Sequence, residues 1–454
     1  MSSSPASLEE LLAQQENIVE WFRDLDMPSR TIWTQPDEYT NWIEEQRSWR
    51  EGCAFRNMSY HMNNLYIEGP DAIDLFSDLG VNSFENFRTQ EPPQAKQLVC
   101  CNPDGYVISD GALYYLDEDE YVTTSTAMLQ HWLEYHIETG EYDVSIEVGN
   151  NPGSADDPRE FRFQVQGPNA KAVMDDVIDG GVPEISLFEI KELTIDDREL
   201  YALGHGMAGS FGVEIAGPYD YHDEIRDRIL EVGKDRGIRQ LGTKSYKTTT
   251  TEIGWFGTLL PAIYDNEELE EYREWLDIHS PEGYLPIGGS YHSDDITDYY
   301  LDPVEMGYEH LIDFDHDFVG KESLREIVDN PRRKRVTLIW DDQDVIDVYA
   351  SLFHEGETSK FIDIPDTYYQ WDYNHNDKVL KDGEIVGISK VPSYNYNERT
   401  MLSLAVIDRK FAEPETELTM VWGDQKSSNS SIERHTETEI TATVAPSPLH
   451  KDRN

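Results

Sequence analysis

The sequence predicts an α+β fold followed by a small C-terminal domain built of β-strands. Paired segments of alternating apolar and polar residues are interspersed with single amphipathic segments, whereas a doubly wound fold would alternate strand and helix regularly. Beyond about residue 335 the segments are short, strand-like and separated by turn residues. Aromatic residues make up 11% of the 454 residues, which indicates a folded core rather than a disordered chain.

The N-terminal elements follow from periodicity and turn residues. Residues 7–25 carry an apolar stripe at helical spacing after a serine, which predicts one amphipathic helix. Residues 37–51 predict a second helix. Residues 63–68 alternate as a strand, and a Gly-Pro turn then leads into a short helix over 71–79.

The middle of the chain continues with strands and isolated helices. Residues 96–101 and 106–115 predict consecutive strands around the turn Asn102-Pro103-Asp104-Gly105. The remaining elements are helices over 128–140 and 221–234 and strands over 162–165, 199–203 and 212–216.

A domain boundary is predicted near residues 328–335, which divides the chain into residues 1–330 and 331–454. The second part is expected to be all β. Its strands are predicted over 335–339, 378–379, 384–389, 402–407 and 417–422.

The charge of the chain is strongly negative. Asp and Glu number 90 against 37 Lys and Arg, for a net charge of −53, and the acidic residues are spread along the whole chain. Such a surface repels itself in dilute buffer and is screened at molar salt. We therefore predict adaptation to a salty cytosol, of the kind haloarchaeal proteins show. A nucleic-acid or anionic-membrane partner is not expected, because the basic run 332–335 is too short to form a binding face.

Cysteine usage and the N-terminal sequence bear on location. Cys53, Cys100 and Cys101 form no disulfide pattern and are expected to be buried thiols. The first residues lack a basic and apolar leader, and no stretch approaches 18 apolar residues. We expect a cytoplasmic protein.

Generic motifs predict no cofactor or metal site. Residues 204–209 satisfy GxGxxG, but a strand over 212–216 follows where a dinucleotide fingerprint requires a helix. Asp313, Asp315 and Asp317 open like a calcium loop, but the later positions of an EF-hand are not met. The histidines lack ligand spacing, so we expect no metal.

Five segments with recognisable motifs occur along the chain. They are Ser59-Tyr60-His61-Met62 with Gly69-Pro70-Asp71-Ala72, the turn and strand over 102–110, Gln166-Gly167-Pro168, Gly212-Val213-Glu214-Ile215, and Asp317-Phe318-Val319-Gly320-Lys321. In this order they resemble the folate-binding aminomethyltransferase family, the family of the glycine cleavage T protein. The resemblance implies a T protein-like folate-binding domain followed by a small C-terminal β-barrel domain.

Further segments carry a closer resemblance. They are Gly242-Thr243-Lys244-Ser245-Tyr246, Glu252-Ile253-Gly254-Trp255, Leu260-Pro261-Ala262-Ile263-Tyr264, Tyr272-Arg273-Glu274-Trp275-Leu276, Ile287-Gly288-Gly289-Ser290 and residues 348–353. Together they resemble the tetrahydrofolate-dependent vanillate/syringate-type O-demethylases over nearly the whole chain. This implies transfer of a methyl group from a methoxy-aromatic, or a similar donor, to N5 of tetrahydrofolate.

The resemblance also implies roles for individual residues. By motif position Tyr246 is the proton donor to the leaving phenol, whose pKa of about 10 it matches. We expect Tyr246 to lie on a loop, with Lys244 and Lys247 as solvated charges beside a strand. Both lysines would lower the pKa of Tyr246 if they pointed inward. For the cofactor, Glu214 is the carboxylate that reads the pterin and Trp255 lines the folate pocket. Asp110 and Gln166 lie on motifs near it.

The substrate side departs from the vanillate-type pattern. His61 is kept, but Met58 stands where the family has a Gln, Thr126 where it has an Arg that clamps a carboxylate, and Trp33 near the place of a tyrosine pair. Loss of that arginine would remove a charge-assisted contact. The resemblance therefore implies a substrate other than vanillate, either a less anionic methoxy-aromatic or another methyl donor.

Three other functions stay open at this point. One is demethylation of a sulfonium or ammonium donor, such as dimethylsulfoniopropionate or a methylated glycine, with Trp33 or Tyr39 facing the cation. A second is the aminomethyltransferase of glycine cleavage, which would need a lipoylated carrier protein as partner. The third is a folate-binding protein without turnover.

Overall fold

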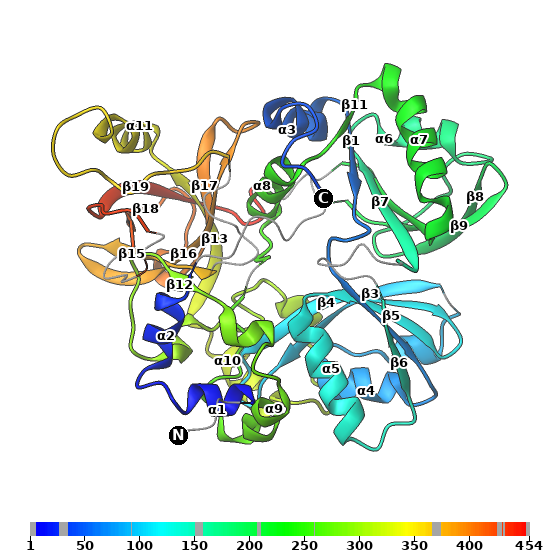
Figure 1. Ribbon diagram of the computed structural model, residues 1–454, viewed down its shortest axis with the longest axis horizontal. Helices are drawn as coiled ribbons and strands as arrows, with labels where there is room; N and C mark the ends of the chain where they lie inside the picture. The colour runs from blue at the N-terminus through cyan, green and yellow to red at the C-terminus, as the bar shows by residue number, and fades with distance from the viewer. Residues whose placement is uncertain are drawn as a thin grey trace.

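The computed structural model describes residues 6–26, 35–91, 93–149, 158–206, 210–257, 259–365, 374–424, 429 and 432–450. Figure 1 shows three bodies side by side: two mixed layers of sheet and helix at the right and a barrel at the left. The α+β class and the C-terminal barrel are therefore confirmed.

The first body is a six-stranded sheet in the order β11-β1-β7-β10-β9-β8. Its strands are β1 (Cys53–Asn57), β7 (Glu160–Gln166), β8 (Ile190–Ile195), β9 (Arg198–Gly204), β10 (Gly212–Pro218) and β11 (Ile238–Gln240). Helices α6 (Ala170–Val177) and α7 (His222–Gly233) cover one face (Figure 1). They pack on Phe161, Phe163 and Val165, the apolar half of β7. The polar half of β7 is buried as well and faces the opposite way.

The second body is a five-stranded antiparallel sheet in the order β3-β4-β5-β2-β6. Its strands are β2 (Asn63–Glu68), β3 (Gln94–Cys101), β4 (Val107–Asp117), β5 (Glu120–Ser125) and β6 (Ser145–Val148), and its helices are α4 (Ala72–Leu79) and α5 (Ala127–Thr139). The core beneath it also takes residues from the N-terminal helices α1 (Leu8–Leu12) and α2 (Ile18–Asp24) and from α9 (Glu270–Trp275). A smaller cluster that contains Tyr66, Tyr114 and Leu203 joins the two sheets.

The third body is a closed barrel in the order β13-β17-β16-β15-β18-β19. Its strands are β13 (Arg333–Trp340), β15 (Asp377–Lys381), β16 (Glu384–Asn395), β17 (Thr400–Asp408), β18 (Glu417–Trp422) and β19 (Thr438–Ala445). Strand β12 (Ile287–Gly288) pairs with β14 (Asn374–His375) beside it. Helices α3 (Trp42–Glu51) and α8 (Thr243–Ile253) lie between the barrel and the six-stranded sheet, and α10 (Lys321–Asp329) leads into β13.

Several predicted elements differ from the structure. The single helix predicted over 7–25 is two helices, because Asn17 caps a new helix by accepting a hydrogen bond from the Glu20 backbone at 3.1 Å. The helix predicted from residue 37 begins at Trp42, after the Asn41 cap. The C-terminal part also contains helix α11 (Asp342–Ser351), which Asp341 caps, and strand β19, which was not predicted. The division of domains at residue 330 stays a prediction.

The segment around Tyr246 is a helix and not the predicted loop. Thr248, Thr249, Thr250 and Thr251 make α8 a poor helix former, because β-branched side chains lose rotamer freedom in a helix. Burial on all sides stabilises it instead, as α8 packs against α3 and β16. The expectation of a solvated charge is wrong for Lys247, which is buried; Lys244 is partly exposed and pairs with Glu38 at 2.8 Å.

The three cysteines are buried free thiols, as predicted. Among the described helices, none combines the length and the apolar character that spanning a bilayer requires.

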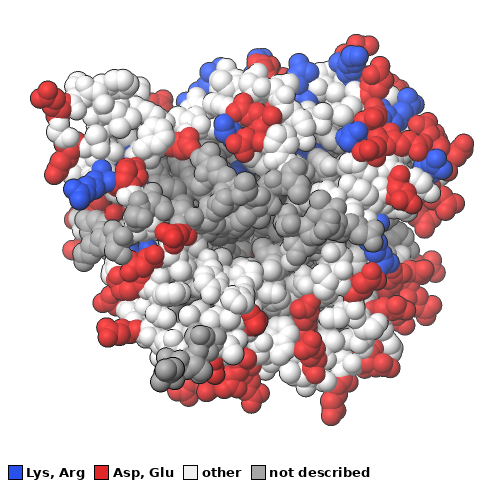
Figure 2. Space-filling view, in the orientation of Figure 1, with Lys and Arg blue, Asp and Glu red and all other residues white. Residues whose placement is uncertain are grey.

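Acidic side chains are dispersed over the face of the molecule seen in Figure 2, with few basic side chains between them. Because self-repulsion falls as the Debye length shrinks from about 10 Å at 0.1 M salt to about 3 Å at 1 M, we expect the melting temperature to rise by several degrees between 0.1 M and 2 M KCl. Thermal unfolding followed by circular dichroism measures this. A melting temperature that stays constant or falls would contradict the predicted adaptation to salt.

Candidate active site

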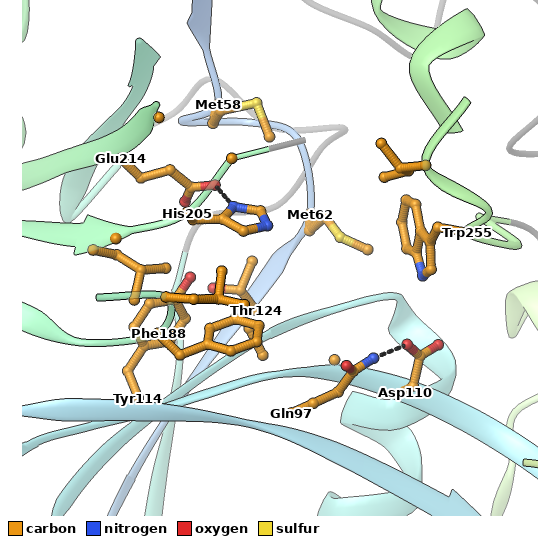
Figure 3. A pocket seen from close by; sticks show the side chains of 18 of the residues that line it. Met58, Met62, Gln97, Asp110, Tyr114, Thr124, Phe188, His205, Glu214 and Trp255 are labelled. Carbon is orange, nitrogen blue, oxygen red and sulfur yellow. Dashed lines mark hydrogen bonds and ion pairs between the residues drawn. The ribbon is translucent and has the colours of Figure 1, made fainter. Parts of the chain in front are cut away.

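A cavity of about 890 Å³ lies where the two sheets, helix α8 and barrel strand β13 meet. Met58, His61 and Met62 enter it from the loop between β1 and β2, and Tyr246 comes from α8. Figure 3 shows Glu214, His205 and Phe188 on one side and Trp255 and Asp110 on the other. Of the nine predicted site residues, six line the cavity: Met58, His61, Asp110, Glu214, Tyr246 and Trp255.

The other three predicted residues lie elsewhere. Thr126 is the N-cap residue that precedes helix α5, and its hydroxyl lies 2.9 Å from that of Ser109. It does not line the cavity. Gln166 is fully buried in β7 between β1 and β10 and does not line it either. Trp33 falls outside the described residues.

Tyr246 and His61 form a buried pair. The Tyr246 hydroxyl lies 2.9 Å from His61 Nε2, and the two rings meet edge to face. The loop that carries His61 is fixed by backbone hydrogen bonds from Met58 to Arg162 at 2.7 Å and from His61 to Met58 at 3.0 Å. The start of α8 is fixed by Glu45, which accepts hydrogen bonds from the Gly242 backbone and the Ser245 hydroxyl.

The ionisation of this pair is set by burial. Burial raises the pKa of Tyr246 above its ordinary 10.0, although the nearby Arg56 guanidinium opposes the rise. Arg56 lies 3.8 Å from the centre of the Tyr246 ring. Burial, with Arg56 and Arg162, lowers the pKa of His61 well below its ordinary 6.5. At neutral pH the pair is therefore a neutral phenol beside a neutral imidazole. Within the described part of the chain, Arg56 is thus a cation that acts to lower the pKa of Tyr246, a role that the sequence suggests only for Lys244 and Lys247.

Glu214 is a buried carboxylate with His205 and Arg162 as neighbours. His205 Nδ1 lies 2.6 Å from one of its oxygens and Arg162 Nε 4.0 Å from the other. Burial alone would raise the pKa of Glu214, but His205 and Arg162 outweigh it and the pKa is lowered. Glu214 therefore stays ionised and can accept hydrogen bonds from a ligand with paired N–H donors.

Arg162 organises this side of the cavity. It donates hydrogen bonds to the Tyr114 hydroxyl at 3.0 Å, to Thr124 Oγ1 at 2.7 Å and to Glu160 at 3.2 Å. The ring of Phe188 stacks on that of His205, with centroids 5.9 Å apart. These contacts fix both the carboxylate and an aromatic surface beside it.

Asp110 is held across the cavity. Its Oδ2 accepts hydrogen bonds from Gln97 at 2.9 Å and from the Tyr308 hydroxyl at 2.8 Å. Burial raises its pKa, and hydrogen bonds from Tyr308, Gln97 and Trp255 counteract this only in part. Asp110 thus fixes the Trp255 indole at the edge of the cavity.

Sequence reasoning did not identify Arg56, Arg162 or His205. Arg162 could have been found, because β7 alternates Glu160, Arg162 and Gln164 with three apolar residues, and an arginine in a central strand signals a buried polar face. His205 lies in the GxGxxG segment and directly follows Gly204, the last residue of β9; strand β10 begins at Gly212, as the sequence predicts, and residues 207–209 lie outside the described part of the chain. The cavity has room for a pterin, with an ionised carboxylate for its donor edge and the flat faces of Phe188 and Trp255, so the residues present fit tetrahydrofolate.

Comparison with known proteins identifies the family of this chain. A family model described as "GCVT N-terminal domain" matches residues 23–258. A syringate O-demethylase from Sphingobium sp. (strain NBRC 103272 / SYK-6) is 36% identical over 97% of this chain and 96% of its own. A sesamin methylene transferase from Sinomonas sp. (strain No.22) is 28% identical over 80% of each. The crystal structure of the glycine cleavage system aminomethyltransferase T from Bartonella henselae shares the fold, with a TM-score of 0.62 at 14% identity over 95% of this chain and 96% of that one.

The fold and the site thus define a folate-binding one-carbon transferase. The chain belongs to the GCVT family. It is a tetrahydrofolate-dependent methyltransferase of the demethylase type, which confirms the prediction from sequence.

Proposed function

We propose that the protein removes a methyl group from an aryl methyl ether and passes it to N5 of tetrahydrofolate. The observation that carries the proposal is the Tyr246–His61 pair, a buried neutral phenol whose hydroxyl faces a cavity large enough for an aromatic ring beside a pterin. The similarity to a syringate O-demethylase supports it. When bound, tetrahydrofolate supplies at N5 the nucleophile that accepts the methyl group.

The difficult part of this reaction is the leaving group. Cleavage of the methyl–oxygen bond leaves a phenolate, which departs more easily if its oxygen receives a hydrogen bond or a proton as the bond breaks. In the proposed mechanism Tyr246 is that donor. Its raised pKa keeps the proton in place at neutral pH, and Arg56 over its ring stabilises the negative charge that Tyr246 gains as the proton leaves.

His61 orients the donor. If the neutral His61 carries its proton on Nε2, it donates to the Tyr246 oxygen, and the tyrosine proton is then directed to the ether oxygen. Met58 and Met62 provide a soft apolar wall for a ring of variable substitution.

We propose that Glu214 and Trp255 hold the cofactor. Glu214 is ionised, and the carboxylate can accept the paired donors of a pterin edge. Asp110 acts through Trp255, which it positions. Gln166 is buried in β7, in the six-stranded sheet that also carries Glu214, and it does not line the cavity.

A product assay tests the proposed function. The protein is incubated with tetrahydrofolate in molar KCl and a panel of methoxy-aromatics, sulfonium compounds and methylated glycines, and 5-methyl-tetrahydrofolate is detected by mass. We expect product from at least one methoxy-aromatic. Product from a sulfonium or amine donor alone would refute the proposal, as would folate binding without methyl transfer from any donor.

The pH dependence follows from the two shifted groups. A general acid works only while it is protonated. Because the pKa of Tyr246 is raised above 10.0, we expect the enzyme to lose activity only above pH 10.0. The pKa of His61 is lowered below 6.5, so no acidic limb is expected near pH 6.5. We expect kcat to be flat between these values. A change of kcat with pH between pH 6.5 and pH 10.0 that disappears in Tyr246→Phe or His61→Gln would contradict the protonation states assigned to this pair.

A further inference from the structure

Three residues of the basic run 332–335, which is too short to bind a partner by itself, form the start of barrel strand β13 at Arg333. Because side chains alternate along a strand, Arg333 and Arg335 point the same way and Lys334 the other. Arg333 pairs with Glu305, with Nη2 and Oε2 2.8 Å apart, and Lys334 is exposed. Arg335 lines the cavity, on the side of Trp255 and Tyr308.

The Arg335 guanidinium lies against backbone. Its Nη1 donates a hydrogen bond to the Met306 carbonyl. At Gly307 an added Cβ would lie 2.5 Å from Nη2, so the absence of a side chain there makes room for the group, and Gly254 also lies near it. The planar guanidinium is therefore held in place by main chain rather than by an acidic side chain.

Arg335 differs from its neighbours in its charge balance. Arg162 has Glu160 and Glu214 beside it, and Arg333 has Glu305. Within the described part of the chain, no carboxylate lies within 4.0 Å of Arg335, and its Nε is buried without a hydrogen-bond partner. A cavity arginine without an acidic partner stands out in a protein of net charge −53, since a buried guanidinium is costly unless a counter-charge reaches it.

We propose that Arg335 binds the carboxylate of a ligand in this cavity, an inference that rests on the cavity being the demethylase site. A guanidinium offers a carboxylate two parallel N–H donors. The carboxylate can come from a methoxybenzoate substrate or from the glutamate tail of tetrahydrofolate. Arg335 lies near Gly254, and the next residue, Trp255, lies across the cavity from Glu214, so the Arg335 contact is separate from the proposed contact of Glu214 with the pterin (Figure 3). If the source is the substrate, an arginine of the barrel supplies the carboxylate contact that Thr126 does not.

Equilibrium binding to two matched ligand pairs tests the proposal. One pair is tetrahydrofolate and tetrahydropteroate, which lacks the glutamate; the other is a methoxybenzoate and the corresponding methoxybenzamide. We expect the wild type to bind the acid of one pair about 10-fold or more tightly than its neutral partner, as a charge-assisted bidentate contact is strong. In Arg335→Gln the two members of that pair should bind within about 2-fold of each other. The ligand pair whose preference is lost shows whether the carboxylate belongs to the substrate or to tetrahydrofolate.

Controls separate charge from position and from folding. Lys334→Gln removes the same charge one residue away on the outward face and should keep the preference. Arg335→Lys keeps the positive charge but lacks the planar guanidinium, so it should keep part of the preference for the acid. This variant tests the proposal even if Arg335→Gln does not fold. No preference in either pair, or a preference that survives both Arg335 substitutions, would overturn the proposal. Because binding needs no turnover, a preference that depends on Arg335 in a protein that demethylates no ether would refute the proposed function alone.

Discussion

Replacing Tyr246 with Phe should lower kcat for demethylation of a methoxy-aromatic by about 10²–10⁴-fold, the range that a positioned general acid contributes. The substitution removes one oxygen from a buried pair and leaves the ring under Arg56 unchanged. The affinity for tetrahydrofolate should change little, because the proposed cofactor contacts are made by Glu214 and Trp255. Single-turnover assays with mass detection measure the rate, and titration of the free protein measures the affinity.

Tyr60→Phe is the matched control for this substitution. Tyr60 is also buried and its hydroxyl is hydrogen-bonded to that of Tyr219 at 2.8 Å, but it does not line the cavity. It should leave kcat within about 3-fold of the wild type if loss of a buried hydroxyl elsewhere affects only stability. A Tyr246→Phe enzyme with undiminished kcat would mean that the leaving group departs without proton donation, as expected for a thioether or an amine.

Replacing Glu214 with Gln should weaken tetrahydrofolate binding by about 10- to 100-fold, since hydrogen bonds to a charged group are worth about 1.5–3 kcal/mol. The change keeps the shape of the side chain and removes the negative charge that His205 and Arg162 hold ionised. The effect should appear mainly in Kd, measured by fluorescence titration, rather than in kcat at saturating cofactor.

Glu199→Gln is the control for Glu214→Gln, because it removes one negative charge from the same sheet without changing the cavity. Glu199 is exposed on β9, in the same sheet as Glu214 but outside the cavity, and its substitution should leave Kd unchanged. If Glu214→Gln bound tetrahydrofolate as tightly as Glu199→Gln did, the cofactor would have to use another carboxylate, and Asp110 would be the candidate within the described cavity.

Helices and strands were predictable from the sequence where the spacing of apolar residues alone decides the secondary structure. The strand at 63–68 alternates apolar and polar residues and is found with those bounds as β2. The apolar stripe from residue 7 predicts a single helix because it continues through the break between α1 and α2, and only the Asn17 cap shows where the second helix starts. Helix α8 could not be predicted from its own residues, because its four threonines disfavour a helix unless tertiary packing encloses it.

Site residues were predictable from the sequence when they lie on a family motif. They were not predictable when only their tertiary contacts bring them to the cavity. Tyr246, Glu214 and His61 lie on segments shared with the family, and the fold brings them to one cavity. Arg56, His205 and Arg335 lie on no such segment. Arg56 and His205 come from the six-stranded sheet and the segment that follows β9, and Arg335 comes from the barrel. The separations of these residues along the chain carry no information on which of them line one cavity.

The sequence by itself determined the fold class, the family and the acidic surface, because these depend on periodicity, ordered motifs and composition. The tertiary structure decided the ionisation of the site. Burial raises the pKa of Tyr246 and lowers that of His61, and Arg162 with His205 keeps Glu214 ionised. These effects depend on exclusion of water and on charges a few ångströms apart. Such distances exist only after segments far apart in the chain have packed together.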